Sequence, residues 1–289
     1  MTRLPAFRRS EWVLSGFFVY MPALALCRTR AFPQPAVFAW LIPVALLAAA
    51  RIDRVSTHRG WSIVRDWIPA VLVLVAYWSV DWAPKRHLDR DLEQSLIGWD
   101  RMVLYEWGLR AGVERLGPLV PAVLELAYLL LYAVLPLTIA GFYVRNERDR
   151  LDDFLFPFLL GTLMTYSLLP HFPSVAPRFV FPGQDLPRVE TVFRQFNLWI
   201  LDHGDIRSSI FPSGHVAVGF SAAFAMALAG PGHRAFALTL LAIAVLVWIN
   251  TIYGRYHYAA DGLVALAVSG ASIGLIAALR RVPARARGR

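Results

Sequence analysis

The stretch SSIFPSGHVAVGF, residues 208–220, joins a Pro-Ser-Gly-His cluster to the start of an apolar run that extends to about residue 229. A run of this kind can cross the hydrocarbon layer of a bilayer, which takes roughly 20 residues as a helix. Ser213 can cap the first turn of that helix, and Gly214 lets a ligand approach the backbone closely. The stretch therefore predicts a membrane helix that begins with a polar, ligand-accessible turn.

Composition places the whole chain in a membrane. Hydrophobic residues make up 57 % of the 289 residues and charged residues only 17 %, which is too apolar for a soluble domain of this length. We therefore expect an all-α, polytopic helix bundle of about eight spans. The candidate spans lie near residues 12–27, 33–50, 67–82, 119–144, 154–170, 214–229, 235–253 and 257–279.

The net charge of +9 comes from arginines dispersed beside the apolar runs, a pattern that fits membrane topology better than nucleic-acid binding. Arginines concentrate in residues 3–9, 51–65, 145–150 and 280–289, whereas only Arg28 and Arg30 lie in the one short loop on the other side. Because cytoplasmic loops are enriched in arginine, both termini are predicted to be cytoplasmic in a multi-pass protein of the cell membrane. Residues 281–289 are then a basic cytoplasmic tail.

Residues 83–118 form the first of two long segments between spans. Their apolar residues recur every three or four positions, as in an amphipathic helix, at Leu88, Leu92, Leu96, Trp99 and Val103. We expect this segment to lie at the outer membrane surface, either packed on the end of the bundle or guiding lipid. It closes an N-terminal part, 1–118, that precedes a catalytic helix bundle over 119–280.

The second long segment, residues 171–211, is rich in proline and is expected to be a functional loop without regular structure. Asp202, His203 and Asp205 in it are metal ligands by type, but three such residues in one loop more often form a solvated turn. We expect no metal and no other cofactor. Glu125, inside an apolar span, either lines a headgroup cavity or pairs with an arginine. Cys27 is the only cysteine, which excludes an intramolecular disulfide.

The predicted topology brings two helix beginnings to one face of the membrane. The helices that start near Ser213 and His257 both present their N-termini there, and a helix N-terminus binds anions through free N–H groups and a partial positive charge. His257 and Asp261 are four residues apart, so the carboxylate can fix the tautomer of the imidazole. Taken alone, this spacing is also that of a structural contact, a histidine at a helix end bonded to a nearby carboxylate. The position of Asp261 favours function, because an ionisable residue inside a membrane helix is costly.

At these residues the sequence resembles the type 2 phosphatidic acid phosphatase superfamily. The resemblance covers roughly residues 119–280 and rests on the order of Arg178, the PSGH cluster and the HYxxD motif. The last motif has the form TxYxxxHYxxD found in the branch that includes the inositol phosphorylceramide synthases, with its residues at Thr251, Tyr253, His257, Tyr258 and Asp261. The resemblance places the chain closest to this inositolphosphotransferase branch.

The resemblance implies metal-independent phosphoryl transfer through a phosphohistidine, on a phosphorylated membrane lipid at the extracytoplasmic face. His257 attacks the phosphorus, and Asp261 stabilises the imidazolium that forms. His215 protonates the leaving oxygen and then activates water or an acceptor alcohol. The phosphate oxygens are bound by Arg178, Ser213 and the amides near Gly214. The acceptor, the lipid and the oligomeric state remain open.

The sequence departs from the hydrolase pattern at two cationic positions. His171 stands where a lysine is usual, seven residues before Arg178, and Thr251 stands where the third motif usually has an arginine. We expect Arg255 and Arg207, together with His171, to contribute to phosphate binding in their place. Either arginine has the alternative role of an anchor at headgroup level.

A second class of function remains open, namely a non-catalytic scaffold or transporter that binds a phospholipid headgroup. Pure binding needs no nucleophile with an orienting carboxylate, so His215, His257 and Asp261 favour an enzyme. Transporters commonly contain repeated halves with interrupted helices, and this sequence shows no such repeat.

Overall fold

The computed structural model describes residues 7–28, 34–56, 58–83, 87–207 and 209–281. Arg3, Arg30 and residues 282–289 of the predicted basic tail lie outside the described residues. The regular structure in the described ranges is helical throughout. This confirms the all-α membrane bundle predicted from composition.

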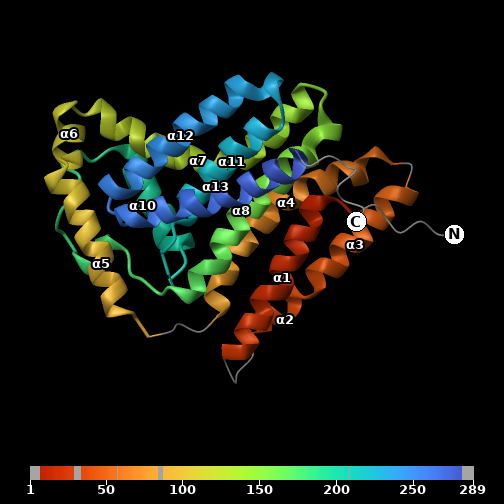
Figure 1. The fold of residues 1–289 in the computed structure, drawn as a ribbon, viewed down its shortest axis with the longest axis horizontal. Coiled ribbons are helices and arrows are strands. Elements are labelled where there is room, and N and C mark those ends of the chain that lie inside the picture. Colours follow the sequence, from red (N-terminus) through yellow and green to blue (C-terminus); the bar gives the residue numbers. More distant parts are fainter. Residues whose placement is uncertain (1–6, 29–33, 57, 84–86, 208, 282–289) are drawn as a thin grey trace.

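Seven helical segments are long and apolar enough to cross a membrane within the described residues. They comprise α1 (Arg9–Arg28), α2 with α3 (Gln34–Ala39 and Leu41–Val55), α4 (Arg59–Ser79, extended to Trp82), α7 (Leu119–Val144), α8 (Leu151–Leu168, within a segment that ends at His171), α12 (Arg234–Tyr253) and α13 (Ala259–Arg281). The eighth predicted span is α11 (Gly214–Leu228), which is apolar but shorter, at 15 residues. In Figure 1, α12 and α13 run closer to the long axis of the molecule, whereas α1, α3, α4 and α8 are inclined to it.

The short helix α11 lies inside the bundle, against α7, α8, α12 and α13. A Cβ atom at Gly219 would meet the Cβ of Ala244 at 3.0 Å, so this glycine permits the close approach of α11 to α12. A full lipid-exposed span is not required of a helix that other helices surround. Its central place therefore positions the Pro-Ser-Gly-His turn at one end of the bundle core.

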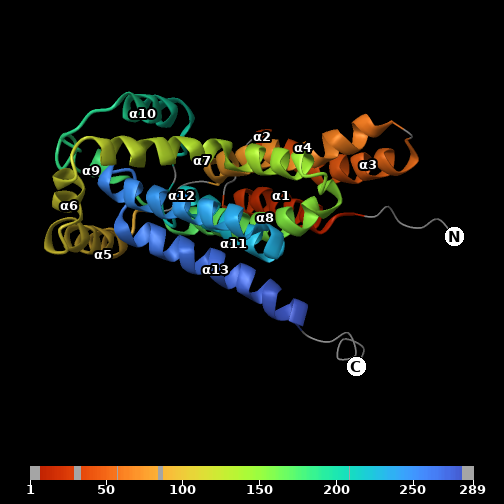
Figure 2. The ribbon, with the colours of Figure 1, turned by 90° about the horizontal axis from the view of Figure 1, so that it is seen from above.

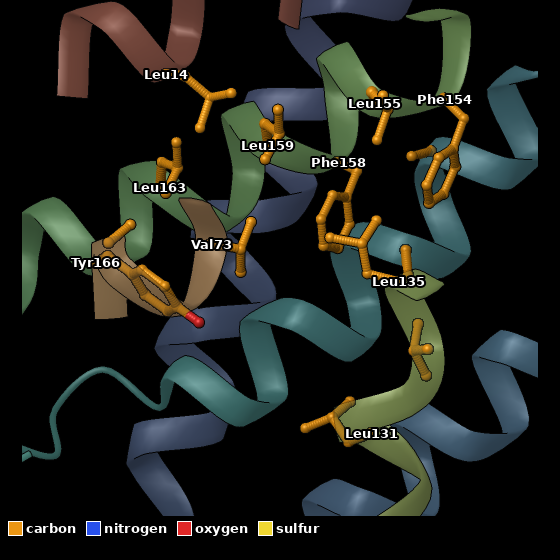
Figure 3. Close-up of a cluster of buried hydrophobic side chains, with 14 of the residues drawn as sticks. Leu14, Val73, Leu131, Leu135, Phe154, Leu155, Phe158, Leu159, Leu163 and Tyr166 are labelled. Carbon is orange, nitrogen blue, oxygen red and sulfur yellow. The ribbon is translucent and has the colours of Figure 1, made fainter. Parts of the chain in front are cut away.

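The main hydrophobic core joins the N-terminal helices to the rest of the bundle. Leu14 of α1, Val73 of α4, Leu131 of α7 and Phe158 of α8 are buried in one cluster (Figure 3). Tyr166, near the end of α8, belongs to the same cluster. Residues before 119 are therefore packed into the core that holds the predicted catalytic bundle.

The predicted amphipathic segment is divided into two helices. Both lie at the end of the bundle where α13 begins. Helix α5 (Arg90–Arg101) is capped by Asp89, which accepts from the amides of Asp91 and Leu92, and it continues through a π-helical turn (Met102–Glu106). Gly108 follows with φ 72°, a conformation that glycine adopts without strain, and α6 spans Leu109–Arg115. Helix α5 packs beside α13, which confirms the interpretation as a helix on the end of the bundle. A role in guiding lipid stays a prediction.

The expectation of an irregular loop over residues 171–211 was wrong in part. Besides a single turn, α9 (Pro177–Val180), this segment contains α10 (Val192–Gly204). The stretch 192–204 has no proline, and the hydroxyl of Thr191 caps it by accepting from the amide of Arg194 at 3.1 Å. Figure 2 shows α10 end-on where it crosses the side of α7.

Candidate active site

His257 lies in the turn between α12 and α13. Helix α13 begins at Ala259, two residues after the predicted start of this span. Its Nδ1 is 3.1 Å from Oδ2 of Asp261, and the amide of Tyr258 donates to the same oxygen at 3.1 Å. Asp261 is fully buried in the first turn of α13. The predicted hydrogen bond between His257 and Asp261 is therefore confirmed.

The beginnings of α11 and α13 meet, as predicted. The Ser213 amide donates to the carbonyl oxygen of Asp261 at 3.1 Å, while the Ser213 hydroxyl caps α11 by accepting from the Val216 amide at 3.3 Å. His215, in the first turn of α11, places its Nδ1 3.5 Å from Nε2 of His257. Two imidazoles and one orienting carboxylate thus lie together at the N-termini of two helices.

Three tyrosines, Tyr77, Tyr128 and Tyr132, surround His215. The sequence analysis did not predict this tyrosine cluster. The His215 ring stacks on Tyr128 with centroids 4.8 Å apart, and its Nε2 lies 3.4 Å from the hydroxyl of Tyr132. The edge of Tyr77 completes the enclosure at 6.0 Å between centroids. Aromatic packing therefore fixes the plane of the imidazole. The helical spacing of Tyr128 and Tyr132 in α7 was the available sequence signal.

The electrostatic surroundings of His257 suit a nucleophile. Burial lowers the pKa of His257 to about 4, with Asp205 opposing the shift and Arg178 adding to it. Its imidazole is therefore neutral at pH 7. Because Asp261 accepts a hydrogen bond from Nδ1–H, the lone pair of a neutral ring resides on Nε2, the atom that faces His215.

Arg178 is bound by a carboxylate that the sequence left as a turn residue. Its Nη2 lies 2.8 Å from Oδ2 of Asp205, and its amide donates to the carbonyl oxygen of Arg255 at 3.2 Å. The hydroxyl of Tyr77 also donates to Asp205. The Nε of Arg178 is buried and has no hydrogen-bond partner among the described residues. Arg178 therefore keeps donor capacity next to the charge pair.

The other predicted phosphate ligands are held in three different ways. Arg255 is 2 % exposed, and its Nη1 lies 2.5 Å from Oδ2 of Asp100 in α5. Arg207 is exposed near Arg178, and its amide donates to both carboxylate oxygens of Asp81. The structure does not bring His171 to the histidine pair. Its Nε2 is 2.6 Å from the Tyr20 hydroxyl, and its Nδ1 accepts from Arg28 at 2.9 Å, so both ring nitrogens contact α1.

Glu125 pairs with an arginine, which resolves the two roles that the sequence left open. Its Oε1 is 3.1 Å from Nη1 of Arg194 in α10, and both residues are buried. The carboxylate also accepts hydrogen bonds from Asn197, Asn250 and Tyr256. This network connects α10 to α7 and α12, next to Tyr128 of the tyrosine cluster.

Two cavities adjoin the candidate site. An apolar cavity of about 120 Å³ extends from His215 between α4, α7 and α8, and its walls include Tyr77, Tyr132, Tyr166, Val73, Leu135 and Phe158. A second cleft, of about 550 Å³, has the Arg178–Asp205 pair in its wall, together with Arg207, Ser174 and Ser209 and with apolar side chains such as Phe179. We call it the Arg178 cleft. His215 therefore borders the apolar cavity, whereas Arg178 borders the mixed polar and apolar cleft.

The helical bundle suits a membrane protein, and it brings the buried His257 and Asp261 together with the partly buried His215. The chain belongs to the PAP2 superfamily, whose sequence model matches residues 94–275. A PA-phosphatase related-family protein of Dictyostelium discoideum is 32 % identical over 131 residues, 42 % of this chain and 22 % of that protein, so the chain spans about a fifth of that relative. No solved structure matches. Family membership supports a phosphatase-type activity.

Proposed function

We propose that this protein is an integral membrane lipid phosphoesterase or phosphotransferase that forms a phosphohistidine on His257 without a metal ion. One observation carries the proposal. The Nδ1 of His257 is held by Asp261 while its Nε2 faces His215 at 3.5 Å. A nucleophile with an orienting carboxylate and an adjacent acid/base group is the arrangement that covalent catalysis requires.

The reaction proceeds in two displacements. In the first, Nε2 of His257 attacks the phosphorus, the P–N bond forms, the P–O bond breaks, and His215 gives a proton to the departing oxygen. In the second, His215 takes a proton from water or an alcohol, whose oxygen attacks the phosphorus and releases His257. Asp261 offsets the positive charge of the phosphorylated imidazole throughout.

The phosphate oxygens are bound by the N-terminal amides near Gly214, by Ser213 and by Arg178. Backbone amides at a helix N-terminus favour an anion without further groups. Arg178 reaches the phosphate after Asp205 releases it. We assign Arg207, exposed in the Arg178 cleft, to the outer part of the headgroup, whereas His171 lies against α1 and contributes least.

A lipid substrate is favoured over a soluble phosphate ester, because the apolar cavity ends at His215. A hydrocarbon chain in this cavity places the attached phosphate beside the two histidines. The Arg178 cleft, of about 550 Å³, has charged and hydroxyl side chains in its wall that can bind a headgroup or an acceptor alcohol. Together with the TxYxxxHYxxD form, this cleft supports the inositolphosphotransferase-like branch and an alcohol acceptor beside water.

An extracytoplasmic site is supported by the arginines at the opposite end of the bundle. There Arg8 at the start of α1 pairs with Asp66 of α4 at 2.6 Å, and Arg148, between α7 and α8, binds the same carboxylate. Short cytoplasmic loops are enriched in arginine, and the connection between α7 and α8, with Arg145, Arg148 and Arg150, is a short loop of this kind. The histidine pair, at the other end, then faces outward.

The test compares turnover by the purified protein in lipid nanodiscs with a chelator present. Phosphate release and headgroup exchange are measured on a panel of lipid phosphomonoesters, diphosphates and phosphodiesters. We expect His257→Ala to abolish turnover and Asp261→Asn to lower it by about 100- to 10,000-fold, because the imidazole loses its orientation. His87→Ala, at an exposed position, is the matched control.

Two results would contradict the proposal. Turnover that persists in His257→Ala excludes this nucleophile, and turnover that the chelator removes excludes the metal-independent route. Saturable binding of a phosphorylated lipid with neither release nor exchange would favour the alternative function, a non-catalytic scaffold or transporter.

A further inference from the structure

Helix α10 buries two polar side chains and exposes three large apolar ones. Arg194 and Asn197 are buried against Glu125 of α7, whereas Val192, Phe196 and Trp199 are 71 %, 48 % and 56 % exposed. Phe196 and Trp199 stack with parallel rings on the exposed side. A helix that faces water has the reverse arrangement. The exposed face of α10 is therefore suited to lipid.

The position of α10 along α7 is consistent with lipid contact. Its partner, Glu125, is the seventh residue of α7, so at 1.5 Å per residue α10 lies about 9 Å along α7 from its first residue. Figure 2 shows α10 across the side of α7, whereas α5 and α6 lie beyond the beginning of α7. Exposed apolar side chains also occur on the two spans that α10 contacts, at Trp78 of α4 and Val123 of α7.

The C-terminal end of α10 reaches the mouth of the apolar cavity. Trp78 at the end of α4 donates from its indole nitrogen to the carbonyl oxygen of Gly204 at 2.9 Å. Leu74 of α4 and Tyr132 of α7 line the cavity and are both exposed, so the cavity opens to the side between these two helices. The residue after Gly204 is Asp205, which binds Arg178. Helix α10 thus links α4, the lateral opening and the charge pair of the site.

We propose that α10 lies in the lipid leaflet at the site end of the bundle and frames a lateral entrance through which a membrane-embedded lipid reaches His215. The entrance rests on the proposed function, whereas the placement of α10 in lipid does not. The occupant of the exposed face is the bilayer itself. Polar residues on one flank of that face, Gln195 and Asp202, are exposed as well and point to the headgroup region.

The placement is tested with nitroxide labels at two adjacent positions in nanodiscs. Cys27, the only cysteine, is first replaced by alanine, and Phe196→Cys and Gln195→Cys are labelled separately. These side chains point about 100° apart on a helix. We expect the label at 196 to collide preferentially with oxygen and the label at 195 with a water-soluble nickel chelate. Equal, nickel-dominated accessibility at both positions would place α10 in water and overturn the proposal.

The entrance is tested with Phe196→Asp and its matched control Gln195→Asp. A charge on the lipid-facing side disturbs the leaflet position of α10 and should raise KM for a long-chain lipid phosphate about tenfold or more, with kcat little changed. KM for a short-chain, water-soluble phosphoester should not change. An equal effect on both substrates, or none, refutes the entrance. If labels behave as expected but no variant turns over any substrate, the proposed function fails and the placement of α10 stands.

Discussion

Replacement of Arg255 separates two roles that this residue can have near a phosphate site. Its guanidinium is buried against Asp100, 155 positions earlier in the chain, and its carbonyl oxygen accepts from the amide of Arg178. Its backbone has φ 67°, a left-handed conformation that costs about 1–2 kcal/mol for a residue with a side chain. We infer that the Asp100–Arg255 pair holds the turn that presents Arg178 and His257.

Removal of one partner from a buried ion pair costs about 3–5 kcal/mol, because the other charge stays buried without compensation. Arg255→Met should therefore lower both the thermal stability and the turnover. Replacement of both partners by apolar residues is often neutral, so Asp100→Leu with Arg255→Met should recover most of both. The experiment is a double-mutant cycle. It measures turnover and thermal unfolding of the wild type, the two single variants and the double variant in nanodiscs. A double variant that is stable but as inactive as Arg255→Met would refute the positioning role and favour direct phosphate binding by Arg255.

The pH dependence of turnover is a second test of the Asp100–Arg255 pair. Burial raises the pKa of Asp100 to about 6, although Arg255 opposes the shift. As the pH falls through this value the carboxylate is protonated and the ion pair is lost, so turnover should decline below about pH 6. In the double variant this decline should vanish and leave the one that His257 causes near pH 4. The same substrate is used throughout, so that its own ionisation cancels.

Two further substitutions test the geometry of the site. A Cβ at Gly262 would lie 2.1 Å from the indole nitrogen of Trp248, so Gly262→Ala should displace the first turn of α13 and lower turnover by more than about tenfold, whereas Gly274→Ala, with open space around it, should leave turnover unchanged. Asp205→Asn should remove the carboxylate that competes for Arg178 and tighten inhibition by vanadate about tenfold, and unchanged or weaker inhibition would show that the pair does not open for an anion.

The parts of the site that follow from local spacing were predictable. His257 and Asp261 are four residues apart, and Ser213 precedes an apolar run, so one turn of helix at each place determines their geometry. The pairing of Asp100 with Arg255 and that of Asp205 with Arg178 were not predicted, because the partners are 155 and 27 positions apart and no local pattern links them. The membrane spans were predictable for the same reason, because the apolar composition of each span is a local property of the sequence.

Helix α10 was missed for a different physical reason. Prolines flank it on the N-terminal side, and its buried face carries Arg194 and Asn197 where a helix of a soluble protein has apolar residues. The partner of this polar face, Glu125, is 69 positions earlier. An inverted helix is recognised only when both its polar partner and its apolar surroundings are known.

The three ion pairs around the histidines also explain how a phosphate can enter a site whose arginines are already paired. Arg255 with Asp100 and Arg194 with Glu125 have side chains 2–5 % exposed, whereas Arg178 and Asp205 are 11 % and 12 % exposed. Opening a fully buried pair strands a charge in a low dielectric, while a partly hydrated pair can exchange one anion for another at lower cost. We therefore expect substrate phosphate to replace the carboxylate of Asp205 on Arg178, while the two buried pairs keep the surrounding turns in place.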